Sequence, residues 1–286
     1  MRRLWLAILI FILFISNAYA VQSTIMDAEG YACMGTDKSR KETEQEAMAD
    51  AKRNAVENAI THIKSETKVK DFQIEKDIID SYTNASVTVL EKKEASWYKD
   101  EKCGDCYRVK LRAEVIPDEK AVQKAVSGKA DLDNPGLPLN VQLWTDKKGY
   151  QNGERIKIYI KGNKPFYARV IYRDSQGNLL QLLPNPFRKD NYFNGGVIYE
   201  IPSGEDEFVL EVNPPFGEEQ IILYSSTSPL GDINLKNEGG GIYQVTTKEK
   251  DIGMKTRGIA LKGKTGSKNS TASEFFEDHL QVKTAH

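Results

Sequence analysis

The chain has 286 residues, of which 40% are hydrophobic and 28% are charged. This composition is typical of a soluble globular protein rather than a disordered one, and the length suffices for two domains of ordinary size. Lysine and arginine number 40 against 41 acidic residues, and both signs are interspersed along the chain. The charge pattern therefore favours neither nucleic acid nor an anionic membrane surface as a partner.

The first 20 residues have the pattern of a secretory signal peptide. Arg2 and Arg3 precede an apolar run at 4–15, and the small-residue motif Ala-Tyr-Ala follows at 18–20. A membrane-spanning helix needs about 20 apolar residues, so cleavage after Ala20 is favoured over an uncleaved anchor. No cysteine follows the motif directly, so we expect no lipid anchor. The expected product is a soluble periplasmic or secreted protein with 38 basic and 41 acidic residues.

Residues 21–117 are predicted to form a small α+β domain, an α/β sandwich with one long helix on a small antiparallel sheet. A short strand is expected at 29–35 and the helix at 39–65. We expect the helix to pack on its own sheet, with helix-to-helix oligomerisation as the alternative. Its predicted buried stripe consists of small or aliphatic residues at every fourth position, namely Ala47, Ala51, Ala55, Ala59 and Ile63.

Cys103 and Cys106 form a C-x-x-C pair at the predicted tip of a hairpin whose strands are expected at 85–94 and 107–116. A redox-active pair normally has its first cysteine at a helix N-terminus, whereas a strand follows here. A zinc site would need a second pair, which the sequence lacks. A structural disulfide between Cys103 and Cys106 is therefore favoured over both. Cys33 is the odd thiol, and its pairing with one of the other two is the minor alternative.

Residues 118–137 are predicted to be a linker that begins with a short helix near 118–126 and continues with turn-forming residues. Beyond it, 138–262 is predicted to be an all-β antiparallel sandwich of about seven strands. The expected strands alternate apolar and polar residues, and they lie at 139–144, 155–160, 167–172, 179–183, 208–212, 220–224 and 254–261.

Residues 263–286 are predicted to be a flexible tail. The run Ser-Thr-Ala-Ser-Glu at 270–274 resembles a capping box, so a short helix is expected to start there and continue through 275–280.

Phe187, Tyr192 and Phe193 lie in a long connection at 184–196 that is rich in proline, asparagine, glycine and charge. Loops of this kind often carry recognition residues, so these three aromatic residues are the candidate contacts to a partner or ligand. The alternative is that the loop folds over the edge of the sandwich.

No catalytic arrangement is recognisable. The three histidines are His62, His279 and His286, and no serine or cysteine lies in a nucleophile-elbow context. No glycine-rich phosphate loop follows a strand. We therefore expect no enzyme activity, cofactor or metal site, although a glycosidase would need only two of the 41 acidic residues.

A family resemblance covers about a third of the chain. Its characteristic segments lie at Trp144, 150–154, 166–177, 183–187, 214–219 and 225–230. Their order and spacing resemble those of the bacterial domain of unknown function 4384. The resemblance implies an accessory module of exported or multidomain proteins and implies no assigned activity.

The first domain is similar to a different group, the small α/β domain of the flagellar assembly protein FlgT and of related outer-membrane-associated lipoproteins. The shared pattern is the strand at 29–35, the alanine-spaced helix and the closing hairpin at 97–115. The sequence departs from that group because it has the C-x-x-C tip and no lipobox. Those relatives serve in structure or assembly.

The expected function is non-enzymatic: an exported accessory protein that binds another envelope protein, as in envelope assembly. The alternative is a carbohydrate or peptidoglycan binding module, since β-sandwiches with exposed aromatic residues often bind glycans.

Overall fold

The structure is a computed structural model that describes residues 20–68, 72–125, 133–257 and 272–286. The predicted signal peptide falls on 1–20, so all but its last residue lies outside the described residues. Residues 126–132 of the predicted linker and 263–271 of the predicted tail lie outside them as well.

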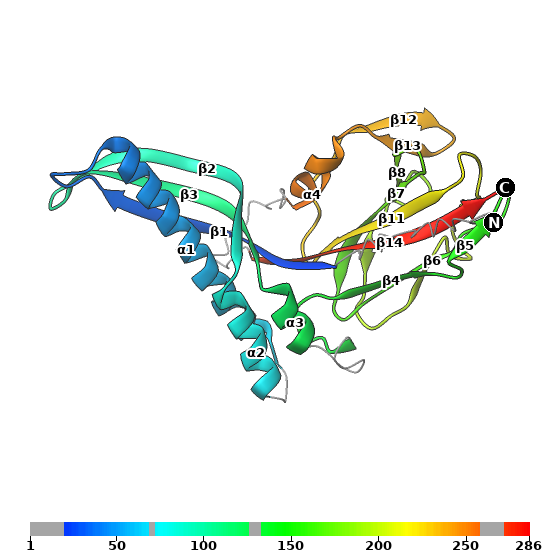
Figure 1. Ribbon diagram of the computed structural model, residues 1–286, viewed down its shortest axis with the longest axis horizontal. Coiled ribbons are helices and arrows are strands. Elements are labelled where there is room, and N and C mark those ends of the chain that lie inside the picture. Colours follow the sequence, from blue (N-terminus) through cyan, green and yellow to red (C-terminus); the bar gives the residue numbers. More distant parts are fainter. Residues whose placement is uncertain (1–19, 69–71, 126–132, 258–271) are drawn as a thin grey trace, which may run out of the picture.

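The N-terminal part forms an arm of three strands with helices beside it (Figure 1). Its elements are β1 (Val21–Cys33), α1 (Arg40–Glu66), α2 (Phe72–Thr83), β2 (Ser86–Asp100), β3 (Gly104–Ile116) and α3 (Glu119–Ala125).

The remaining part is mostly antiparallel β-structure. Its elements are β4 (Val141–Thr145), β5 (Gly149–Gln151), β6 (Ile158–Gly162), β7 (Phe166–Arg173), β8 (Leu179–Leu183), β9 (Tyr192–Phe193), β10 (Tyr199–Ile201), β11 (Glu218–Ser226), β12 (Leu235–Gly239), β13 (Ile242–Val245), α4 (Glu249–Arg257) and β14 (Ser273–Ala285).

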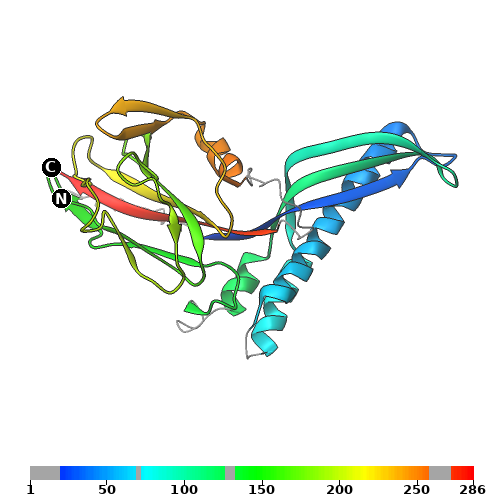
Figure 2. The same cartoon turned by 180° about the vertical axis from the view of Figure 1, so that it is seen from behind.

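The fold class is mixed α+β, as predicted, but one sheet extends through both parts. The larger sheet has 11 strands, of which nine follow the order β12-β13-β8-β7-β11-β14-β1-β3-β2, while β5 pairs with β14 and β9 with β7. It curls into a half-barrel, and a three-stranded sheet in the order β10-β6-β4 lies across from its curled part (Figures 1 and 2). The predicted α/β sandwich and the predicted all-β sandwich share this sheet, because β14 pairs with both β1 and β11.

Helix α1 confirms the prediction made from its alanine spacing. Ser39 caps the helix in a capping box, in which its hydroxyl accepts from the Glu42 amide and the Glu42 carboxylate accepts from the Ser39 amide. The five stripe residues Ala47, Ala51, Ala55, Ala59 and Ile63 are all fully buried. They pack on β1 and β3 of the same chain, as expected, and the helix covers one face of the arm (Figures 1 and 2).

Two segments near the C-terminus differ from their predictions. The expected strand at 254–261 is helix α4 as far as the described residues reach, and the expected terminal helix is strand β14. Phe275 and Phe276 alternate across the sheet and bury both rings, Phe276 among the residues between the two sheets and Phe275 against the α4 side. The capping-box pattern was misleading because long-range pairing outweighs a local helix signal.

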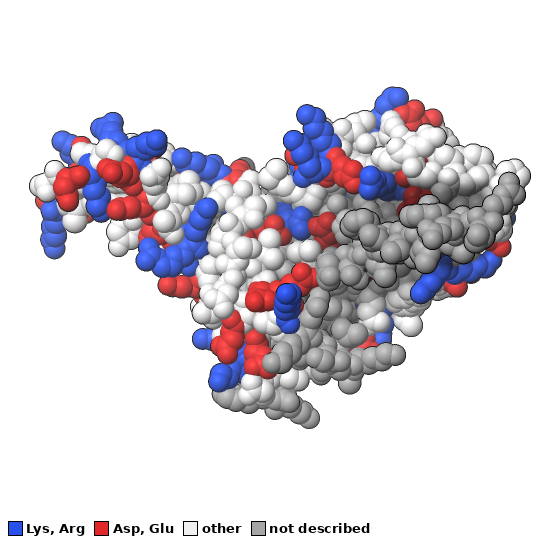
Figure 3. Space-filling model, viewed as in Figure 1, with Lys and Arg blue, Asp and Glu red and all other residues white. Residues whose placement is uncertain are grey.

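The region predicted as a linker contains α3, which confirms the short helix expected there. No helix in the described residues combines the length and the apolar character that crossing a bilayer requires. Positive and negative side chains are mixed over the face seen in Figure 3, including the arm.

Candidate functional site

A groove of about 440 Å³ opens between the two sheets of the C-terminal part. Every residue of the extended segment 208–215 lines it. Further residues come from β8, the loop that follows it and the turn between β12 and β13, namely 180–182, Asn185, Phe187 and 240–242, and Ile156, Ile158, Tyr172, Asp174 and Ile221 complete the lining. We call this the Phe187 groove. It is the size of a pocket for a small ligand or for a few residues of a peptide.

The Phe187 groove has an apolar floor and apolar residues at its rim. Ile158 and Ile221 are fully buried beneath it. Phe187, Val209 and Ile242 line it with exposed fractions of 48%, 54% and 50%. Large side chains with half their surface in water are candidates for contact with another molecule, particularly where they border a concave surface.

The position of Phe187 is set by close packing against the β12–β13 turn. Its ring lies 6.1 Å from that of Phe208 at an interplanar angle of 23°. A Cβ atom added to Gly241 would lie 2.2 Å from Phe187 Cε2, and Gly241 has a φ of +85°. Both the close approach and the left-handed backbone therefore require glycine at this position.

The residues with polar side chains that line the Phe187 groove are Tyr172, Asp174, Gln181, Asn185, Glu211 and Asn213. Gln181 is 5% exposed, and its Nε2 donates to the Pro184 carbonyl at 2.7 Å. The Gln181 Oε1 atom is buried and has no hydrogen-bond partner among the described residues. Asp174 and Glu211 supply the charge, and no described residue that lines the groove is basic.

The three aromatic residues predicted as contacts occupy different environments. Phe187 lines the groove. Tyr192 is 45% exposed on β9, and its ring lies 5.0 Å from that of Tyr167. Phe193 is 1% exposed and belongs to the core, where its ring lies 5.4 Å from that of Phe166. Phe193 cannot present its ring to a partner, because the alternation of β9 turns it inward.

Local sequence patterns indicate almost nothing of the groove itself. The segment 208–212 was predicted as a strand and instead forms an isolated bridge between Arg155 and Glu211, flanked by backbone hydrogen bonds. The groove is lined by this segment together with residues that are distant from it in sequence, such as 180–182 and 240–242. The exposed Val209 within an otherwise alternating run was its one local indication.

Residues 149–229 match the family described as domain of unknown function (DUF4384). This DUF4384 region extends from β5 through β11 and supplies most of the Phe187 groove, whereas residues 240–242 lie outside it. No curated protein and no solved structure matches the chain. The resemblance of the N-terminal part to FlgT therefore stays a prediction.

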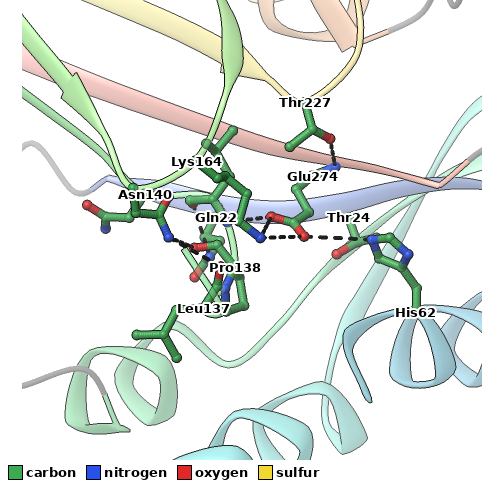
Figure 4. Close-up of polar contacts among 12 residues, drawn as sticks. Gln22, Thr24, His62, Leu137, Pro138, Asn140, Lys164, Thr227 and Glu274 are labelled. Atoms are coloured by element: carbon green, nitrogen blue, oxygen red, sulfur yellow. Dashed lines mark hydrogen bonds and ion pairs between the residues drawn. The ribbon is translucent and has the colours of Figure 1, made fainter. Parts of the chain in front are cut away.

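A buried polar cluster joins the arm to the DUF4384 region (Figure 4). Its centre is Glu274 of β14, which is 3% exposed. Lys164, in the loop between β6 and β7, lies with its Nζ at 3.0 Å from one carboxylate oxygen of Glu274, and the Leu139 amide donates to the same oxygen. His62 of α1 points at the other oxygen from 3.7 Å.

The cluster is arranged to hold the structure together. Burial raises the pKa of Glu274, but His62, Lys164 and the Leu139 amide outweigh it and keep that pKa below its ordinary value. The carboxylate is therefore an ionised acceptor whose oxygens are already engaged by cationic and amide donors. Within the described residues, no group of three or more His, Cys, Asp or Glu side chains is placed to hold a metal ion.

The disulfide of the structure joins Cys33 to Cys106, and Cys103 is free and exposed. The predicted Cys103–Cys106 bond is therefore wrong. The hairpin turn precedes Gly104, which places Tyr98 opposite Cys106 across the hairpin, while Cys33 lies opposite Cys106 on the other side of β3. Cys103 lies in the turn and Cys106 lies on β3 three residues later, so the two cysteines are not cross-strand partners. A disulfide is compatible with an oxidising, extracytoplasmic location.

Proposed function

We propose that this chain is an exported, non-enzymatic accessory protein that binds another protein of the cell envelope through the Phe187 groove. The observation that carries the proposal is the groove itself, an apolar concavity bordered by three large side chains that are each about half exposed. A few buried anchor residues, often aromatic, supply most of the binding free energy in protein interfaces.

The disulfide and the signal-like N-terminus support the exported part of the proposal. Disulfides form and persist in oxidising compartments and are rare in the cytosol. The match of 149–229 to DUF4384 adds the accessory role that the resemblance implies. The family description itself names no activity.

Photo-crosslinking in living cells tests the binding role. A photoreactive phenylalanine analogue at Phe187 should form a discrete protein adduct after irradiation, whereas the same analogue at Ile198 should not. Ile198 is 58% exposed and does not line the groove, so it controls for exposure alone. The adduct should disappear when Val209 is also changed to glutamate. Equal adducts at both positions would contradict the proposal.

One feature favours the alternative of glycan binding. Trp144 on β4 and Tyr159 on β6 stack at 5.6 Å with an interplanar angle of 15°. Leu143 and Ile158 point into the core, so alternation places the two half-buried rings on the outer face of the three-stranded sheet. A flat aromatic pair can accept the apolar face of a sugar ring.

Retention on purified peptidoglycan and on a glycan array tests this alternative. Glycan binding at the stacked pair should be lost in Trp144→Ala and kept in Val209→Glu. Binding to glycan combined with absence of any protein adduct at Phe187 would replace the protein-binding proposal with the glycan-binding one.

A further inference from the structure

We infer that the Phe187 groove takes an extended segment of a partner protein that carries apolar side chains and one basic residue. The inference rests on the proposed function and adds the class of segment that is recognised. Three properties of the groove support it: its apolar surface, the backbone that forms one side of it and the sign of its charge.

The apolar surface requires apolar side chains in the ligand. The floor contains fully buried isoleucines, and Phe187, Val209 and Ile242 add exposed apolar area at the rim. Each apolar side chain of a ligand that is buried here contributes about 25 cal/mol per Å² of area removed from water.

The backbone of 208–215 makes an extended ligand the best fit. All eight residues line the groove although their side chains alternate in direction, so the main chain itself forms part of the wall. The hydrogen bonds Ile156 N to Leu210 O and Val212 N to Glu154 O flank the Arg155–Glu211 bridge. This antiparallel pattern directs the N–H and C=O groups of Glu211 away from Arg155. They form an edge that a peptide strand can extend.

The negative charge of the groove favours a ligand with a positive charge. Asp174 and Glu211 both line it, and no basic side chain among the described residues does. A lysine or arginine in the segment is therefore favoured, and an acidic residue is disfavoured by repulsion.

Fluorescence anisotropy with the purified protein and a labelled, acetylated peptide tests the inference. The probe is an octapeptide of alternating leucine and threonine with one central lysine. Replacing the lysine with glutamate should weaken binding about tenfold or more. N-methylation of alternate amides should weaken it about fivefold, because it removes the donors for the open edge. Equal affinity of the three peptides would overturn the inference.

Two protein variants locate the binding. Val209→Asn should weaken binding of the lysine peptide about tenfold, because it removes apolar contact area without adding charge, while Ile198→Asn should leave it unchanged. Both positions are exposed aliphatic residues, and only Val209 lines the groove. Thermal unfolding of each variant checks that the fold is retained. A loss of binding in both variants, with both folded, would overturn the placement in the groove.

The two proposals can fail separately. A Val209-dependent protein adduct at Phe187 in cells, together with no binding of the lysine peptide, would overturn the inference about the segment and leave the proposed function standing. Selective binding of the lysine peptide without any protein adduct in cells would support the segment class and count against the proposed function.

Discussion

Gly30 of β1 approaches Ala51 of α1 so closely that a Cβ atom added to the glycine would lie 2.1 Å from the Ala51 amide nitrogen. The same atom would lie 2.4 Å from the Ala47 carbonyl oxygen, and both neighbours are backbone atoms that cannot rotate away. The small residues of the helix and the missing side chain of the strand thus act together to set the separation of helix and sheet.

Gly30→Ala should therefore destabilise the protein by about 2 kcal/mol or more, because helix and strand must separate to admit the methyl group. Urea unfolding measures the change. Gly204→Ala is the matched control, since nothing lies within 4 Å of its added Cβ atom. Equal stability of the two variants would show that the helix does not pack this closely.

Removal of the disulfide should weaken the fold more than removal of the free thiol. The bond joins residues 73 positions apart, and closing such a loop stabilises a protein by about 4 kcal/mol in the chain-entropy view. Cys33→Ser should lower the unfolding midpoint markedly, whereas Cys103→Ser should not. Thiol titration of the unreduced, unfolded protein should find one reactive thiol per chain, and alkylation followed by peptide mapping should place it at Cys103.

The Glu274 cluster should make stability fall in acid. The folded-state pKa of Glu274 lies below its unfolded value, so its contribution is present above the unfolded pKa of about 4.3 and is lost as the pH falls through the folded value. Glu274→Gln should cost about 3 kcal/mol at pH 7, and this cost should shrink in acid. Glu218→Gln, at an exposed position on β11, should change little at either pH. Unfolding at a series of pH values measures both.

Glu219 should affect the pH dependence of stability in the opposite direction to Glu274. Burial raises its pKa in the folded protein, against the opposing effect of the Tyr172 and Thr284 hydroxyls. Ionisation therefore costs free energy in the folded state, and the cost appears as the pH rises above the unfolded pKa. Glu219→Gln should stabilise the protein at pH 7, and the gain should vanish in acid. A constant difference across the pH series would exclude this titration as the cause.

Substitution of Phe187 should mainly weaken binding, whereas substitution of Phe193 should mainly weaken stability. Phe193→Ala removes a fully buried ring and should cost about 3–5 kcal/mol of unfolding free energy. Phe187→Ala should cost much less, because half of the ring is already in water, yet it should weaken binding of a groove ligand. Thermal unfolding and the anisotropy measurement, run on both variants, distinguish the two roles.

The elements that could be predicted from sequence are those whose signal is local. The stripe from Ala47 to Ile63 is periodic over more than four turns, and Leu179–Leu183 is bounded by turn residues on both sides. The helix and the strand were found for that reason.

The features that were missed depend on residues distant in sequence. The pairing of Cys33 with Cys106 follows from the register of β1 on β3, which residues near the C-x-x-C motif do not reveal. The local sequence predicts a helix at Phe275 and Phe276, whereas the structure has a strand there. The difference arises because the burial of both rings depends on partners on other elements. The Phe187 groove also depends on residues distant in sequence, since segments such as 180–182, 208–215 and 240–242 line it.

The central place of β14 has a consequence for how the chain reaches its folded state. Val21 pairs with Glu277, so β1, the first described strand, cannot complete its pairing before β14, the last described strand, is available. For a chain that we propose to be exported, both β1 and β11 keep an uncovered edge until Ser273–Ala285 has emerged from the secretion channel. Open edges pair readily with other chains, and contacts of such long sequence separation form slowly. The protein should therefore depend on a holding chaperone during export more than one whose strands pair in the order of synthesis.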